Sequence, residues 1–144
     1  MPYIRIYLHI VWATKNREPL LKKEIRQNVF EHIKQYTQSK DIFLDVIGGW
    51  NDHVHGLFSI DATQTIANIM NLIKGETSFW INKNQLTAQK FEWQDDYFVV
   101  SVSPKDIERV RNYIRNQETH HSKKTFQQEY NEFLEQCGFE IIKG

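Results

Sequence analysis

The order of its strand-like and helix-like hydrophobic patterns constrains the fold of this chain more than any other feature. Residues 3–13 alternate between apolar and polar side chains, which is the period of a strand with one buried face. Further patterns predict, in chain order, a helix over about 21–39, a hairpin of strands over 42–50 and 53–60, a second helix, and a strand over 91–102. This β-α-β-β-α-β order is typical of an α+β, ferredoxin-like antiparallel sheet with helices on one face.

Local signals refine the ends of these elements. They are a cap for the second helix at Asp61 or Thr63, an interruption of that helix at Gly75, and a bend or bulge at Asp95–Asp96. Ser103 and Pro104 then start a third helix that runs to about Gln117 or further, and a last helix is expected over 124–137. We therefore predict one domain over 1–144, with a C-terminal helical extension from about 104.

The composition excludes several classes of protein. The 144 residues carry 18 basic and 18 acidic side chains, so the formal net charge is zero, which argues against a strongly basic nucleic-acid coat protein. A hydrophobic content of 40% excludes a disordered chain. No apolar run approaches the ~20 residues of a membrane helix, and the single Cys137 excludes an internal disulfide and a Cys-cluster zinc site. We expect a cytoplasmic protein without a membrane partner.

Charge is distributed unevenly along the chain. Residues 125–144 contain four glutamates and one lysine, a net charge of −3, whereas the residues before them carry a net charge of +3. The acidic segment is most simply interpreted as the solvated face of the last helix.

Two histidines in the third expected strand form the first candidate site. His53 and His55 are alternate residues of that strand, so their side chains project from the same face and could meet at one cation, while Val54 points into packing. A merely polar strand face is the alternative interpretation.

A tyrosine on the third expected helix forms the second candidate. Tyr113 lies one turn before Gln117, on the flank of an apolar stripe made by Ile107, Val110 and Ile114. A free phenol titrates near about 10 and is a poor nucleophile at neutral pH, but a nearby divalent cation would polarise a phosphoryl group under attack. The alternative interpretation is an amphipathic edge residue with its hydroxyl in water.

Five stretches carry a resemblance that covers almost the whole chain. They are LHIVWATKNREPLL, GGWNDHVHGLFSI, IKGETSFWIN, FEWQDDYFVVSVS and VRNYIRNQETHHSKKTFQQEYNEFL. On these stretches the chain resembles the single-tyrosine insertion-sequence transposases of the HUH superfamily, the TnpA-like and REP-associated tyrosine transposases among them. The HUH motif is matched by His53, Val54 and His55, and the family's tyrosine helix by Tyr113 and Gln117.

The resemblance implies a DNA strand transferase that uses no ATP. Tyr113 would attack a DNA phosphate, leaving a 5′-phosphotyrosine link and a free 3′-hydroxyl that later attacks another such link. His53, His55 and Gln117 would hold Mg²⁺ or Mn²⁺. The implied partners are single-stranded DNA with hairpin ends and a second copy of the chain, since family members act as dimers. In several of them the tyrosine helix serves the partner's histidines.

Basic side chains near the expected site are candidates for contacts with DNA phosphates. The DNA-binding residues that we predict are Lys15, Arg17, Arg109 and Arg115. The first cluster extends through Lys22, Lys23 and Arg26, and the second also includes Arg111, Lys123 and Lys124. Each cluster can instead be a solvated helix face. Three other functions stay open: a domesticated relative or nuclease that no longer transposes, a non-catalytic ferredoxin-like nucleic-acid-binding module, and a metal-binding structural protein.

Overall fold

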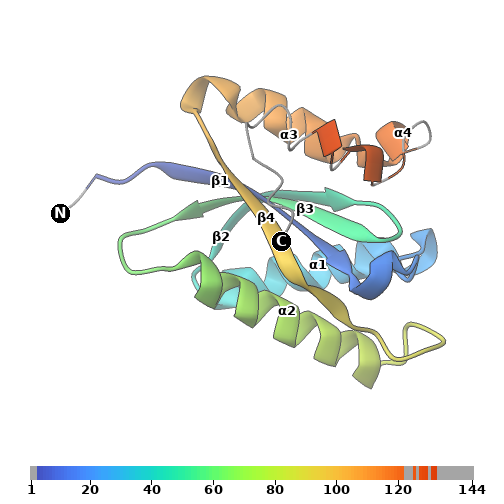
Figure 1. The fold of residues 1–144 in the computed structure, drawn as a ribbon. Coiled ribbons are helices and arrows are strands. Elements are labelled where there is room, and N and C mark those ends of the chain that lie inside the picture. The colour runs from blue at the N-terminus through green and yellow to red at the C-terminus, as the bar shows by residue number, and fades with distance from the viewer. Residues whose placement is uncertain (1–2, 122–124, 126, 130, 133–144) are drawn as a thin grey trace, which may run out of the picture.

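A four-stranded antiparallel sheet forms the centre of the protein. The computed structural model describes residues 3–121, 125, 127–129 and 131–132 (Figure 1). The strands are β1 (Ile6–Thr14), β2 (Phe43–Gly49), β3 (His53–Ile60) and β4 (Trp93–Val102), in the order β2-β3-β1-β4. The predicted ferredoxin-like topology is therefore confirmed.

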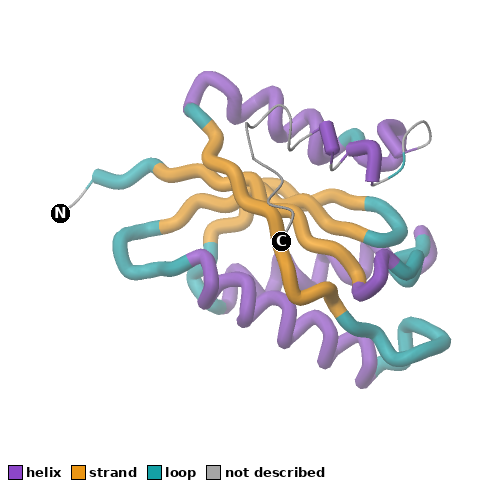
Figure 2. Tube along the Cα trace, viewed as in Figure 1, coloured by secondary structure: helices purple, strands orange, loops and turns teal. Residues whose placement is uncertain are grey.

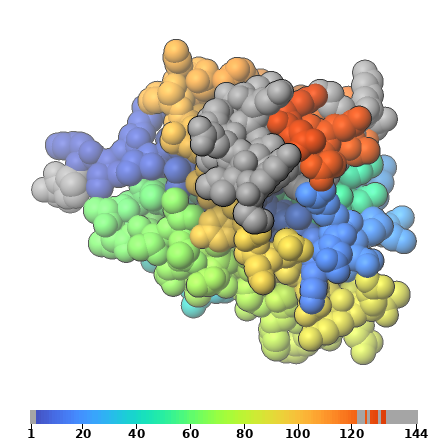
Figure 3. Space-filling view, viewed as in Figure 1, coloured from blue at the N-terminus to red at the C-terminus, as the bar shows by residue number. Residues whose placement is uncertain are grey.

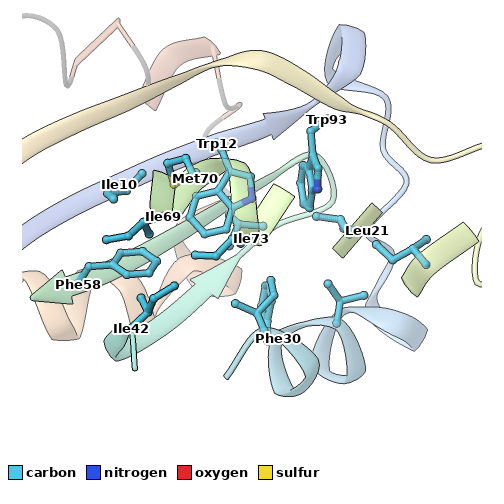
Figure 4. Close-up of a cluster of buried hydrophobic side chains, with 14 of the residues drawn as sticks. Ile10, Trp12, Leu21, Phe30, Ile42, Phe58, Ile69, Met70, Ile73 and Trp93 are labelled. Atoms are coloured by element: carbon cyan, nitrogen blue, oxygen red, sulfur yellow. The ribbon is translucent and has the colours of Figure 1, made fainter. Parts of the chain in front are cut away.

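Two long helices cover one face of this sheet. They are α1 (Lys23–Ser39) and α2 (Ile66–Lys83), which lie side by side below the strands in Figure 2. Their apolar side chains pack against Ile10, Trp12 and Phe58 of the sheet, and Figure 4 shows the resulting core. Burial of these large side chains supplies most of the apolar surface that holds the two layers together.

The opposite face carries the C-terminal helices. A 3₁₀ turn, η2 (Pro104–Asp106), leads into α3 (Ile107–Arg115), and α4 (Gln117–His121) follows after Asn116. Both helices lie above the sheet in Figure 1. Among the described residues, none of the helices combines the length and the apolar character that crossing a bilayer requires.

The helices on this second face change how β1 is buried. The sequence predicted one buried face for residues 3–13, but from Leu8 to Thr14 every residue of β1 is buried, His9 and Val11 included. At the N-terminal end, by contrast, Ile6 is 43% exposed. The polar face of β1 is thus an interior surface between the sheet and the segments that cover it.

Three predicted element boundaries differ from the structure. Helix α2 runs without interruption through Gly75, and its cap is Thr65, whose hydroxyl accepts from the Asn68 amide; neither Asp61 nor Thr63 caps it. Asp61 instead accepts two backbone hydrogen bonds in the preceding turn. Helix α3 ends at Arg115, before Gln117.

Two other local expectations have different outcomes. The register between β1 and β4 shifts between Trp12 and Thr14, opposite the stretch that contains Asp95–Asp96, so the predicted irregularity is present. The last predicted helix, over 124–137, falls mostly outside the described residues; 127–129 and 131–132 are helical.

Candidate metal centre

The histidine pair lies on the sheet face that the C-terminal helices cover. His53 and His55 are both 0% exposed, and their rings meet edge to face with centroids 4.9 Å apart. Alternation along β3 places them together, as the sequence predicted. His53 Nδ1 lies 2.8 Å from the Asp52 carboxylate, which fixes the ring's orientation.

Helix α3 brings Tyr113 over this pair. Ile107 and Ile114 are buried against β2 and β3, which turns the Tyr113 ring toward the histidines. The centroids of the Tyr113 and His55 rings are 5.6 Å apart in an edge-to-face contact. Tyr113 therefore lies beside the histidine pair of its own chain.

The close approach of α3 to the sheet depends on a glycine of β2. A Cβ added at Gly48 would overlap the carbonyl oxygen of Ile114, the residue that follows Tyr113. Only a residue without a side chain allows this backbone contact, so Gly48 sets the height of the tyrosine above the histidines.

We expect the substitution Gly48→Ala to destabilise the protein by about 3 kcal/mol, because the new methyl group must push α3 off the sheet. Gly75→Ala is the matched control, since a Cβ at this exposed position of α2 meets nothing within 4 Å. It should be neutral or stabilising by about 0.5–1 kcal/mol. Urea unfolding followed by circular dichroism measures both, and equal midpoints for the two variants would contradict the role of Gly48.

Helix α4 supplies the next side chains. Gln117 is 1% exposed, and its Oε1 lies 3.3 Å from His53 Nε2. His121 is 7% exposed, and its ring lies edge to face with that of His53 at 4.6 Å. The sequence placed Gln117 on the same helix as Tyr113, but the chain turns at Asn116, so the amide belongs to a separate short helix.

A buried arginine fixes α4 against the rest of the protein. Arg26 is 2% exposed; it donates to Glu118 Oε1 at 2.7 Å and to Asn51 Oδ1 at 2.8 Å. Its guanidinium also lies 4.9 Å from the centroid of the Trp50 ring, which stacks on His121. The prediction that Arg26 belongs to a phosphate-contacting basic cluster is therefore wrong, because the side chain is buried and both of its terminal nitrogens donate inside the protein.

A glutamate from the C-terminal segment lies at the centre of the site. Glu129 is 1% exposed, and one of its oxygens, Oε1, lies 2.9 Å from His55 Nε2 and 3.3 Å from His53 Nε2. The other oxygen, Oε2, lies 3.1 Å from His121 Nε2 and accepts a hydrogen bond from the Tyr113 hydroxyl. The interpretation of the acidic segment as a solvated face is thus wrong for Glu129.

The donor atoms of four residues are close enough to share a cation. The nitrogens of His53, His55 and His121 and a Glu129 oxygen all lie within 4.8 Å of one another. Ligands of one ion with bonds of about 2.1 Å are separated by about 3.0–3.4 Å, and the distances from Glu129 Oε1 to the two strand histidines match this spacing. Imidazole nitrogens and a carboxylate oxygen suit a divalent transition-metal ion. The cluster therefore fits a divalent metal site.

Burial and hydrogen bonding shift the pKa values of these groups in different directions. Burial lowers the pKa of His9 to about 3 and that of His55 to about 4, so both imidazoles are neutral at pH 7. Burial would also lower the pKa of His53, but hydrogen bonds to Asp52 and Glu129 outweigh it and raise the value.

The pKa values of Glu129 and Tyr113 shift in opposite directions. Burial would raise the pKa of Glu129, but hydrogen bonds from His121, His53 and His55 outweigh it and hold the pKa well below its usual range. Burial and the neighbouring Glu129 raise the pKa of Tyr113. The described side chains therefore keep the tyrosine protonated beside an ionised carboxylate.

The four predicted DNA-binding residues are exposed and lie in two places. Lys15 and Arg17 are in the turn η1 (Lys15–Arg17) that follows β1, where Lys15 pairs with Glu92 and Arg17 donates to Gln127. Arg109 and Arg115 project from α3 and lie near acidic side chains of their own helical segment. In Figure 3 the described C-terminal residues, in red, lie against the blue η1 region.

A cleft of about 470 Å³ opens beside the histidine face. Val11 and Ala13 of β1 line it, and in the sheet these residues pair directly with His55 and His53. Arg17 and Phe98 line it as well. The cleft thus continues from the strand next to the histidines to the exposed η1 turn.

Sequence reasoning missed three residues of this site. Alternation along residues 3–13 predicts only that His9 lies on the polar face of the first strand, yet its Nε2 lies 2.9 Å from His55 Nδ1. His121 and Glu129 lie beyond the tyrosine helix, and no short-range periodicity connects them to the sheet. The one available signal was composition, because histidine and glutamate are metal ligands and both occur soon after Tyr113.

Comparisons with known proteins find relatives that match most of the chain. The sequence profile described as "Transposase IS200 like" matches residues 3–117. The ISDra2 transposase TnpA of Deinococcus radiodurans is 22% identical over 114 residues, which span 76% of this chain and 81% of that protein.

Two solved structures share the fold. One is a protein from Deinococcus radiodurans R1 assigned as a transposase, with a TM-score of 0.66, 21% identity, and coverage of 81% of this chain and 93% of that one. The other is a REP-associated tyrosine transposase bound to a REP hairpin, with a TM-score of 0.63, 14% identity, and coverage of 84% and 72%. At sequence identities of 21% and 14%, the similarity to these two structures shows a shared fold.

Proposed function

Because the chain belongs to the IS200-like transposase family, whose members are DNA strand transferases, we propose that it cuts and rejoins single-stranded DNA through a covalent bond between Tyr113 and a 5′-phosphate. One observation carries this proposal. The Tyr113 hydroxyl and the buried pair His53 and His55 converge on the same carboxylate, that of Glu129. A nucleophile and a set of cation ligands within one small volume are the parts that phosphoryl transfer requires.

The proposed step breaks one phosphodiester bond and forms another. The Tyr113 oxygen bonds to phosphorus, the bond from phosphorus to the 3′ oxygen breaks, and that oxygen leaves as a hydroxyl after taking a proton from water. The proton that Tyr113 loses passes to water, because the lowered pKa of Glu129 makes its carboxylate a poor proton acceptor. Glu129 Oε2 orients the Tyr113 hydroxyl through the hydrogen bond that it accepts. The reverse attack by a 3′-hydroxyl reseals the DNA, and the phosphotyrosine bond conserves the energy, so no ATP is needed.

We propose that His53, His55 and Gln117 hold Mg²⁺ or Mn²⁺, with Glu129 as a further oxygen donor. The Nε2 atoms of the two histidines face Glu129, and the Gln117 amide oxygen lies 3.3 Å from His53 Nε2. Imidazole alone favours softer ions, and the two oxygen donors make the set suitable for Mn²⁺ or Mg²⁺. When bound, the ion supplies Lewis acidity to the phosphoryl oxygens and offsets the charge of Glu129, which would otherwise repel DNA.

A single-stranded segment next to a hairpin is the substrate that we propose. The solved relative that carries a REP hairpin supports a folded DNA end as the ligand. The cleft beside the histidine face supports a path for the unpaired nucleotides, with Arg17 at its rim. Lys15, Arg109 and Arg115 remain the proposed contacts with phosphates outside the cleft.

We also propose a homodimer, formed through an edge of the sheet. Strand β1 is paired on both sides, whereas β4 lies at an edge of the sheet. Tyr97 on β4 is 37% exposed, and an unpaired strand with an exposed aromatic residue favours strand addition.

Sedimentation at micromolar concentration should therefore give about twice the chain mass of 17.3 kDa. Tyr97→Lys places a charge on the β4 edge and should yield the monomer. Phe43→Lys is the control, because Phe43 is 53% exposed at the other edge, on β2, and its replacement should leave the dimer intact. A wild-type protein that sediments only as a monomer would rule out this interface.

Covalent trapping tests the proposed chemistry. The wild-type protein is incubated with Mn²⁺ and a 3′-labelled single-stranded DNA that carries a hairpin, and the products are resolved on a denaturing gel. A labelled band at the mass of protein plus DNA is the expected result. Hairpin binding without any such band would instead support a nucleic-acid-binding module.

A further inference from the structure

The metal-ligand candidate His55 has a buried partner behind it. His9 on β1 is 2% exposed, and its Nε2 lies 2.9 Å from His55 Nδ1. In the sheet His55 pairs with Val11, so His9 is its diagonal neighbour on the same face, and the two ring centroids are 5.1 Å apart. Strand register therefore makes these two side chains neighbours on one face of the sheet.

The second strand histidine has a partner in the equivalent position. His53 Nδ1 lies 2.8 Å from Asp52 Oδ1, on the side of the ring away from the site. The Nε2 atoms of both histidines instead face Glu129, at 3.3 Å from His53 and 2.9 Å from His55. Each ring thus has its Nδ1 held from behind and its Nε2 directed to the same point.

This arrangement determines where each imidazole proton lies when a cation binds. An imidazole that binds a cation through Nε2 must carry its proton on Nδ1, and that proton needs an acceptor. The Asp52 carboxylate is such an acceptor for His53. The Nε2 atom of His9 is an acceptor for His55 when the His9 imidazole carries its proton on Nδ1. Partners of this kind are normally carboxylates, carbonyls or waters, so a neutral histidine is an unusual choice for His55.

We propose that His9 is a positioning residue that orients His55 for cation binding, and that Asp52 has the same role for His53. The inference rests on the proposed function only in taking the two strand histidines as cation ligands. It requires neither DNA cleavage nor Tyr113. Asp52 is a carboxylate, whereas His9 is a neutral imidazole. His9 therefore orients His55 through its position and its hydrogen bond alone.

Mn²⁺ affinity without DNA tests this proposal, measured by electron paramagnetic resonance of the free ion. His9→Phe fills the same buried space but offers no acceptor, and it should weaken Mn²⁺ binding about 10–100-fold. His9→Gln retains an amide oxygen that can accept from His55 Nδ1, and it should recover most of the affinity. Asp52→Ala, at a partly exposed position outside the packed core, should weaken binding by a similar factor.

Two controls separate positioning from folding. His32→Phe replaces a histidine that stacks on Trp80 between α1 and α2, and it should leave the Mn²⁺ affinity unchanged. Thermal unfolding without metal shows whether each variant is folded, and a folded His9→Phe protein with weak Mn²⁺ binding excludes a purely structural role. Should His9→Phe fail to fold, the Gln and Asp52 variants still decide the proposal.

The outcomes distinguish this inference from the proposed function. Wild-type Mn²⁺ binding that weakens in His9→Phe and recovers in His9→Gln supports the positioning role, even when no DNA adduct forms. Folded His9→Phe and Asp52→Ala proteins that bind Mn²⁺ within about twofold of the wild type would overturn it, even when the adduct forms normally. Absence of any Mn²⁺ binding to the wild type at millimolar concentration would overturn both.

Discussion

Replacing Tyr113 with phenylalanine should abolish the covalent adduct with DNA while leaving the fold and hairpin binding intact. The ring of Tyr113 packs edge to face against His9, His55 and His120, and phenylalanine keeps all three contacts. The hydroxyl and its hydrogen bond to Glu129 are lost. Because that oxygen is the proposed nucleophile, adduct formation should fall by more than about 10³-fold.

The adduct is measured on a denaturing gel with labelled hairpin DNA and Mn²⁺, and hairpin binding is measured by a native gel shift. Tyr36→Phe is the matched control, since Tyr36 lies on α1 on the opposite side of the sheet and loses the same single atom. It should form the adduct at the wild-type rate. An adduct that persists in Tyr113→Phe would assign the nucleophile to another residue.

Sequence periodicity predicted those parts of the site that depend on local geometry. Alternation along one strand placed His53 beside His55, and the pattern of the third helix directed Tyr113 to the flank of the stripe that packs on the sheet. The β-α-β-β-α-β order then brought the strand and the helix together, as Figure 1 shows. These relations need only neighbours in sequence and a known topology.

The parts of the site that depend on long-range packing could not be predicted in this way. Glu129 reaches the histidines from a segment 74 residues beyond His55, and nothing in its local pattern distinguishes it from solvated glutamates such as those expected nearby. Alternation along the first strand predicts only a polar surface at His9. The segments that bury this face lie beyond residue 100, so the local pattern does not reveal them. Gly75 was read as a helix break, yet packing of α2 on the sheet outweighs the roughly 1 kcal/mol that one glycine costs.

The second large effect is expected at the metal. Substitution His55→Ala removes an imidazole whose Nε2 faces Glu129 at 2.9 Å, and it leaves a cavity in a fully buried position. The Mn²⁺ concentration for half-maximal cleavage should rise at least about 100-fold, because one of two strand ligands is lost. His32→Ala, outside the site, should keep the wild-type Mn²⁺ dependence. An unchanged Mn²⁺ dependence in folded His55→Ala would exclude this histidine as a ligand.

The identity of the oxygen ligand can be decided by two further variants in the same titration. Gln117 and Glu129 each place an oxygen 3.3 Å from His53 Nε2, so distance alone does not rank them. Their charges rank the two ligands, because in a buried site a carboxylate attracts a divalent cation far more strongly than a neutral amide does. Glu129→Ala should therefore raise the Mn²⁺ requirement more than Gln117→Ala. The reverse order, with tighter Mn²⁺ binding in Glu129→Ala, would mean that Glu129 competes with the cation for the histidines and that Gln117 supplies the oxygen.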